Sequence, residues 1–131
     1  MRLWHQKLIP YLDNQRLLGQ HRECCALRGN GWGKKHSVVD YVFIHNTTYL
    51  ACYHSLVMDE MFRRGYLPDT TWYIPNYRGK NVGVDKSWSS NYNFSKHNGM
   101  LYPEHNDDYL NECIDLLKKK EAPIDWSKVN I

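Results

Sequence analysis

The sequence of 131 residues predicts an all-α fold: a single compact domain of three main helices with long aromatic-rich loops. Three segments carry apolar residues three and four positions apart, which is the spacing of one buried helix face. The first two segments start after a residue that caps helices and stop at a glycine, and the third stops before a proline. The length suits one hydrophobic core, so we expect the domain to span residues 1–131.

The first helix is predicted over residues 15–28, with Asp13 or Asn14 as its N-cap and Gly29 as its end. Its inward face and edges are expected to carry Leu17, Leu18, His21, Cys24, Cys25 and Arg28. These positions follow helical and not strand spacing, so one side of the segment should pack against the core.

Glu23 stands out on this helix because a small residue lies about one turn before it and another about one turn after it. Gly19 costs a helix interior about 1 kcal/mol relative to alanine, and Ala26 is the second small residue. Residues three and four apart are neighbours on a helix surface. We therefore expect another group to approach the Glu23 carboxylate closely, in a basic surround that includes Arg16 and Arg22.

The second helix is predicted from a cap at Asn46 or Thr47 to a stop at Gly65. Its apolar positions are Tyr49, Leu50, Tyr53, Val57, Met58, Met61 and Phe62. Ahead of it, residues 38–44 have the β-branched and aromatic content of a short strand, although no hairpin partner is evident.

The third helix is predicted over residues 105–119, and Pro123 prevents its continuation. Its inward positions are Tyr109, Leu110, Cys113, Ile114 and Leu117. Trp126 lies in a tail that should fold back onto the domain. Residues 68–104 are rich in Gly, Asn, Ser, Pro and aromatics without periodicity, and so long an irregular stretch is usually functional.

The basic residues gather near the N-terminus. The net charge is +3 for the whole chain, but residues 1–36 carry seven Lys and Arg against two acids, whereas residues 101–131 carry four against seven. The whole chain also contains five Trp and ten Tyr, many of them in polar sequence where a hydrophobic core would not use them. Basic charge beside exposed aromatic rings is typical of proteins that bind nucleic acid.

Several protein classes are excluded by the composition. The longest apolar run, Tyr41 to Ile44, is far shorter than the ~20 residues of a membrane span. No signal-peptide pattern is present, so we expect no membrane contact and a cytoplasmic location. The four cysteines include no Cys-x-x-Cys motif and the seven histidines no i, i+4 pair, which predicts no metal site. We also expect no cofactor.

Short motifs follow one another along almost the whole chain. They are Gln15, Arg22 with Glu23, Lys35 with His36, residues 59–66 (DEMFRRGY), residues 69–71 (DTT) and residues 102–105 (YPEH). In this order they resemble the pyrimidine-dimer DNA glycosylase and AP lyase family, which is endonuclease V-like. The resemblance implies a helical fold with the N-terminal segment between helices. It also implies a DNA repair enzyme that acts on damaged or abasic double-stranded DNA, and we expect the protein to be a monomer.

The resemblance further implies that the nucleophile is the chain's own α-amino group, with Glu23 as the essential glutamate beside Arg22. Arg2 is too large for removal of the initiator methionine, so the nucleophile is the α-amine of Met1. It would attack C1′, form an imine and release the base, while Glu23 stabilises the cation and assists β-elimination. An α-amine has a pKa of ~7.7–8.0, so roughly a tenth is free base at pH 7.

The catalytic residues expected are thus Met1, Arg2, Arg22 and Glu23. The expected contacts to DNA phosphates are Arg28, Lys34, Lys35, His36 and Arg78, and those to the distorted duplex are Trp32, Trp72, Tyr73 and Tyr77. Two alternatives remain from the residues themselves. One is a non-catalytic nucleic-acid-binding protein of the same fold, and the other is a metal-dependent hydrolase that combines histidines with Glu23.

Overall fold

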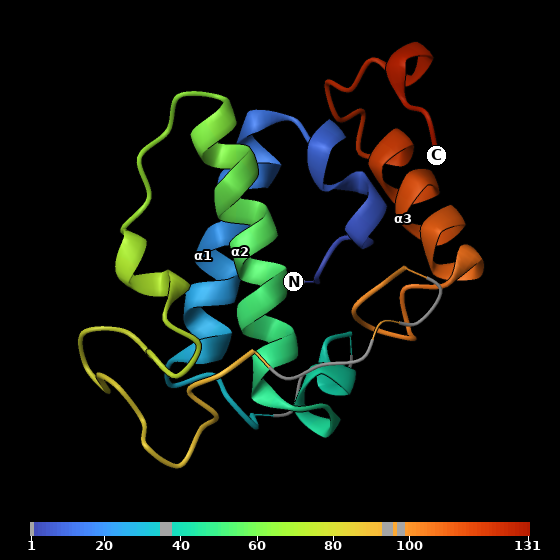
Figure 1. Ribbon diagram of the computed structural model, residues 1–131. Helices are drawn as coiled ribbons and strands as arrows, with labels where there is room; N and C mark the ends of the chain where they lie inside the picture. The colour runs from blue at the N-terminus through green and yellow to red at the C-terminus, as the bar shows by residue number, and fades with distance from the viewer. Residues whose placement is uncertain (1, 35–37, 93–95, 97–98) are drawn as a thin grey trace.

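The computed structural model describes residues 2–34, 38–92, 96 and 99–131. In this part of the chain every regular element is a helix, and Tyr77 and Val84 form an isolated β-bridge. The α-helices α1 and α2 lie side by side, and α3 stands apart from them across the N-terminal segment (Figure 1). The all-α prediction is confirmed.

Helix α1 spans Asn14–Arg28, as the capping pattern predicts. Asp13 caps it by accepting a hydrogen bond from the backbone N–H of Arg16, and Gly29 follows its last residue. Its buried residues are Leu17, Gln20, Cys24, Leu27 and Arg28. The buried face is therefore rotated from the predicted one, because the polar Gln20 points inward while His21 and Cys25 are only half-buried.

Helix α2 spans Thr47–Arg63 and begins at an Asn46 cap, which accepts from the backbone N–H of Thr48. Its buried residues include Leu50, Ala51, Tyr53, His54, Val57, Met58 and Met61. Gly65 ends it with a φ of 92°, a left-handed conformation that glycine adopts without steric cost. This helix is confirmed from cap to stop.

Helix α3 spans Asp107–Lys119, two residues shorter at its start than predicted, because Asn106 and not an earlier residue caps it. Leu110, Cys113 and Leu117 are buried. The tail folds back as expected, since the Lys118 ammonium lies 5.2 Å from the centroid of the half-buried Trp126 ring.

The strand expected over residues 38–44 is wrong. Residues Asp40–Ile44 form a 3-10 helix, η2, in which Val42 is buried. The backbone N–H of Val42 binds the Val39 carbonyl at 3.0 Å. Without a neighbouring strand to pair with, this apolar segment satisfies its backbone locally.

Three further 3-10 helices complete the described chain: η1 (Gln6–Tyr11), η3 (Thr70–Tyr73) and η4 (Trp126–Lys128). Element η1 packs on α2. Leu8 within η1 and Leu3 ahead of it are both fully buried. The N-terminal segment thus lies between the α1–α2 pair and α3, as the resemblance implies (Figure 1). None of the described helices combines the length and apolar composition needed to cross a membrane.

Candidate active site

A buried glutamine holds the backbone that follows residue 1. The Gln20 amide on α1 accepts from the Trp4 backbone N–H at 2.7 Å and donates to the Arg2 carbonyl at 2.9 Å. The Tyr53 hydroxyl donates to the Trp4 carbonyl at 2.6 Å. Gln20 is 2% exposed and Tyr53 is fully buried, so water does not compete for these bonds. The backbone from Arg2 to Trp4 is therefore fixed beside α1.

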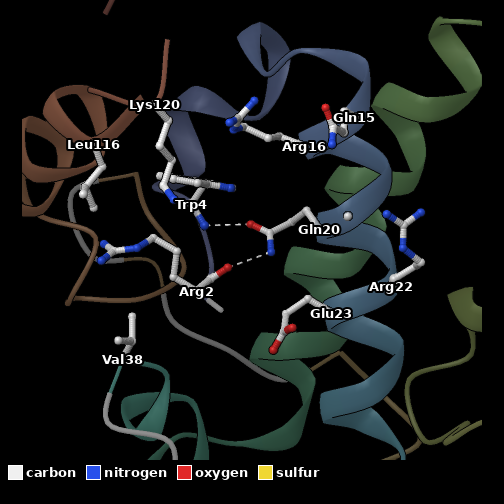
Figure 2. Close-up of a pocket in the computed structure, with 11 residues that line it drawn as sticks. Arg2, Trp4, Gln15, Arg16, Gln20, Arg22, Glu23, Val38, Leu116 and Lys120 are labelled. Atoms are coloured by element: carbon white, nitrogen blue, oxygen red, sulfur yellow. Dashed lines mark hydrogen bonds between the residues drawn. The ribbon is translucent and has the colours of Figure 1, made fainter. Parts of the chain in front are cut away.

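The side chain of Arg2 is turned toward α3. Its guanidinium binds Glu112 at 2.8 Å and lies 5.8 Å from the centroid of the Tyr109 ring. The Tyr109 hydroxyl also donates to the carbonyl of Leu3. In Figure 2 the Arg2 guanidinium points toward Leu116, away from Glu23. Arg2 thus joins the N-terminal segment to α3 and does not contact the Glu23 carboxylate.

A pocket of about 490 Å³ opens where these elements meet (Figure 2). Its lining comprises Arg2, Trp4, Gln15, Arg16, Gly19, Gln20, Arg22, Glu23, Val38, Leu116 and Lys120. Four of these side chains are basic and one is acidic, so the pocket favours an anionic ligand.

Glu23 reaches into this pocket from α1, one turn beyond Gln20 and on the same side (Figure 2). Its Oε1 atom is buried. Gly19 lines the pocket beside it, and a methyl group at Gly19 would come within 3.7 Å of the Arg22 guanidinium. Ala26 is exposed and lines a different pocket. Of the two small residues that flank Glu23 on the helix, Gly19 lines this pocket and Ala26 does not.

Arg22 and Lys120 supply cations on opposite sides of the pocket. Figure 2 shows Arg22 leaving the outer side of α1, and Lys120 comes from the residue that follows α3. Both are exposed. Within the described chain neither forms an ion pair, whereas Arg16 pairs with Asp13. Their charges are available to an anionic partner.

Three predicted site residues, Met1, Lys35 and His36, lie outside the described residues. The others can be placed. Of the basic residues expected to contact DNA, Lys34 is exposed, at the edge of a second pocket of about 580 Å³ that Lys80 also lines.

Arg28 was expected to bind phosphate, and the structure places it in the interior. It is fully buried, and its guanidinium donates to the carbonyls of Trp72, Ile74 and Tyr77 at 2.7, 2.7 and 3.1 Å. Burial lowers the pKa of this arginine. A side chain enclosed in this way cannot reach a DNA backbone, so its inward placement is confirmed and its role as a phosphate contact is not supported.

Arg78 is also occupied by the protein itself. It binds Asp85 at 2.8 Å and donates to the carbonyls of Arg28 and Gly29, each at 2.8 Å. Its guanidinium carbon lies 4.4 Å from the centroid of Trp88. Arg28 and Arg78 together tie the loop after α2 to the end of α1.

The four aromatic residues expected at the duplex are half-buried and packed against other side chains. Trp32 contacts the rings of Phe43 and Trp88, and Trp72 contacts that of Tyr77. The Tyr73 hydroxyl donates to Asp59 at 2.7 Å. These rings support the loops around α1, which leaves their role at DNA a prediction.

Sequence reasoning did not assign a role at the site to Gln20, Tyr53 or Lys120. A signal for Gln20 was present, because it follows Leu17 by three residues and precedes Cys24 by four on the apolar face. A polar residue at such a position is buried and needs specific partners. Lys120 had no comparable signal, since three consecutive lysines at a helix end are explained by the helix dipole.

Comparison with known proteins supports an enzyme that acts on DNA. The family model described as pyrimidine dimer DNA glycosylase matches residues 1–74, which include α1, α2 and every α1 residue of the pocket. Searches among curated proteins and among solved structures found no match. The family match covers more than half of the chain and agrees with the helical fold. The chain therefore belongs to the pyrimidine dimer DNA glycosylase family.

Proposed function

We propose that the protein is a DNA glycosylase and AP lyase whose nucleophile is the α-amine of Met1. The observation that carries this proposal is the pair of hydrogen bonds in which the Gln20 amide accepts from the Trp4 backbone N–H and donates to the Arg2 carbonyl. They fix the start of the described chain beside the helix turn that bears Glu23. Arg2 lines the basic pocket, and the α-amine belongs to the residue that is bonded to Arg2.

An α-amine suits this chemistry better than a lysine. With a pKa of ~7.7–8.0 against ~10.4, a far larger fraction is unprotonated at neutral pH and able to attack C1′. Attack forms a C–N bond and breaks the bond to the base, which leaves after protonation. Loss of the amine proton and ring opening then give the imine.

Glu23 would act on the intermediate. A carboxylate at the pocket wall stabilises the positive charge that develops on the sugar and the imine. It can also accept a proton from C2′, which leads to elimination of the 3′ phosphate. Arg22 and Lys120 are exposed on the pocket rim, where they can bind the phosphates that flank the reacting nucleotide.

The volume of the pocket suits one extruded nucleotide. About 490 Å³ lies in the range of sites that enclose small ligands. Base, sugar and phosphate of one residue would enter only if the nucleotide leaves the stack, as in other enzymes that act on a base. The family match indicates pyrimidine dimers as the damage recognised.

Borohydride trapping tests the proposal. An imine between the protein and an abasic site is reduced to a stable secondary amine, which shifts the DNA on a denaturing gel. We expect an adduct with the unmodified protein and at least a ~100-fold slower strand cleavage by Glu23→Gln. Asn111→Ala, an exposed change on α3, should behave like the parent protein. Salt-dependent DNA binding without an adduct would instead select the non-catalytic alternative.

A further inference from the structure

A second cluster of chemically capable side chains lies on the other flank of α1. His21 and Cys25 extend from α1 and His54 from α2, and their ligand atoms all lie within 4.8 Å of one another. Successive helix residues turn by about 100°, which places His21 and Cys25 about 160° away from Glu23 around the helix axis. The cluster is therefore separate from the pocket.

The three ligand atoms form a triangle of suitable size for a metal ion. His21 Nδ1 and His54 Nε2 are 2.8 Å apart, and Cys25 Sγ lies 4.0 and 3.9 Å from them. An ion in this plane, about 2.0 Å from each nitrogen, lies about 2.3 Å from the sulfur. These are the usual Zn–N and Zn–S distances, so the three ligand atoms are suitably spaced for such an ion.

The kinds of ligand narrow the choice of ion. Two imidazoles and one thiolate select thiophilic ions such as Zn²⁺ and Cu⁺ over Mg²⁺ or Ca²⁺, which require oxygen ligands. His54 is fully buried, and the other two are half-buried, so one side of the triangle is accessible to an entering ion.

When no ion is bound, Arg28 determines which atoms of the cluster carry protons. Its Nη1 lies 2.9 Å from His54 Nδ1, and because arginine only donates, that nitrogen must accept. His54 then carries its proton on Nε2 and donates it to His21. Burial raises the pKa of the Cys25 thiol to about 11, so this sulfur is also protonated.

We propose that His21, Cys25 and His54 bind one thiophilic closed-shell ion, Zn²⁺ or Cu⁺, which cross-links α1 and α2. On binding, the His54 Nε2 proton and the Cys25 thiol proton leave to solvent, and the ion takes their place. The Arg28 guanidinium then stabilises the imidazolate of His54. Because α1 carries Gln20 and Glu23, the cross-link stiffens the helix on which the pocket is built.

Metal titration tests this site directly. The full-length protein is stripped with a chelator and titrated with Zn²⁺ against a chromophoric competitor, and separately with Cu⁺ under reducing, oxygen-free conditions. We expect one equivalent of at least one of these ions to bind and to raise the melting temperature. Co²⁺ should give a thiolate-to-metal charge-transfer band. The two arms show which ion is preferred.

Matched variants identify the ligands. Since changes to groups around metal ligands cost about 10–100-fold in affinity, Cys25→Ser and His21→Asn should each lose at least about 100-fold. Cys52→Ser removes a half-buried thiol on α2 outside the cluster and should bind as the parent does. Far-UV circular dichroism confirms folding, and either ligand variant suffices if the other is unfolded. If the parent protein binds no ion, or if a folded ligand variant binds as tightly as the parent, the proposal is overturned. The three side chains would then form only a chain of hydrogen bonds.

Discussion

Gln20 and Trp4 are joined by a hydrogen bond of 2.7 Å between a buried side-chain amide and a backbone N–H, across sixteen positions of sequence. The same amide donates to the carbonyl of Arg2. The Gln20 side chain thus supplies the hydrogen bonds that a neighbouring strand would otherwise give to the Trp4 N–H and the Arg2 carbonyl. The backbone from Arg2 to Trp4 depends on α1 for its position.

Replacement of Gln20 by alanine should therefore harm stability and chemistry together. Two backbone groups lose their partners, and each buried unsatisfied group costs about 1–3 kcal/mol. We expect the free energy of unfolding to fall by about 2–4 kcal/mol in urea denaturation, and adduct formation to slow by more than tenfold at a temperature where the variant is folded. A variant that loses stability but traps abasic DNA at the parent rate contradicts a positioning role.

Arg22 and Lys120 should contribute to DNA affinity through charge. Each phosphate contact releases about one counterion, so the slope of log K against log salt should fall by about one in Arg22→Ala and in Lys120→Ala. Fluorescence anisotropy with a duplex containing a reduced abasic site measures this slope. Slopes equal to that of the parent protein would place the DNA elsewhere.

Arg28 should behave in the opposite way. Arg28→Met leaves the carbonyls of Trp72, Ile74 and Tyr77 without their donor and should destabilise the protein by more than about 3 kcal/mol, as loss of a buried, hydrogen-bonded charge does. The salt slope for DNA should stay within error of the parent value, because this guanidinium does not reach solvent. A reduced slope with unchanged stability would restore Arg28 as a phosphate contact.

His105 should make the protein sensitive to acid. Burial lowers its pKa to about 3, and its Nδ1 accepts from the backbone N–H of Gln6 at 3.0 Å. In the unfolded chain its pKa is ~6.5, so between these values the unfolded state binds a proton that the folded state does not. The contribution of His105 to the free energy of unfolding is therefore fully present above pH ~6.5. It falls by up to ~1.4 kcal/mol per pH unit as the pH drops toward 3.

The measurement for His105 is chemical denaturation at several pH values between 4 and 8. His105→Asn keeps an acceptor near Gln6 but does not titrate, so the decline in stability below pH ~6.5 should become shallower by about one proton. An unchanged pH dependence would show that other groups cause the acid sensitivity.

The helices were predictable because their signals are local. Asp13 and Asn46 cap the helices that follow them, and Gly65 ends α2, all within a few residues of the apolar pattern. Residues 38–44 were mistaken for a strand because β-branched composition does not reveal whether a pairing partner exists. Their observed 3-10 turn follows from the lack of that partner.

The candidate site was predictable only in part, because its partners are distant in sequence. Glu23 could be found from its neighbours and from the family resemblance. Gln20 acquires its role from Trp4 and Tyr53, and Arg28 acquires its carbonyl partners from a loop without periodicity. A buried arginine and an exposed one look alike in sequence, so charge alone placed Arg28 at the DNA.

The central claim, that the α-amine of Met1 is the nucleophile, is tested most directly by mass spectrometry of the borohydride-reduced adduct. Digestion of the trapped complex should give a peptide that begins at Met1 and carries the reduced sugar on its α-nitrogen. Acetylation of that amine should abolish the adduct while DNA binding persists. Modification of a lysine side chain, or full trapping by the acetylated protein, would contradict the account.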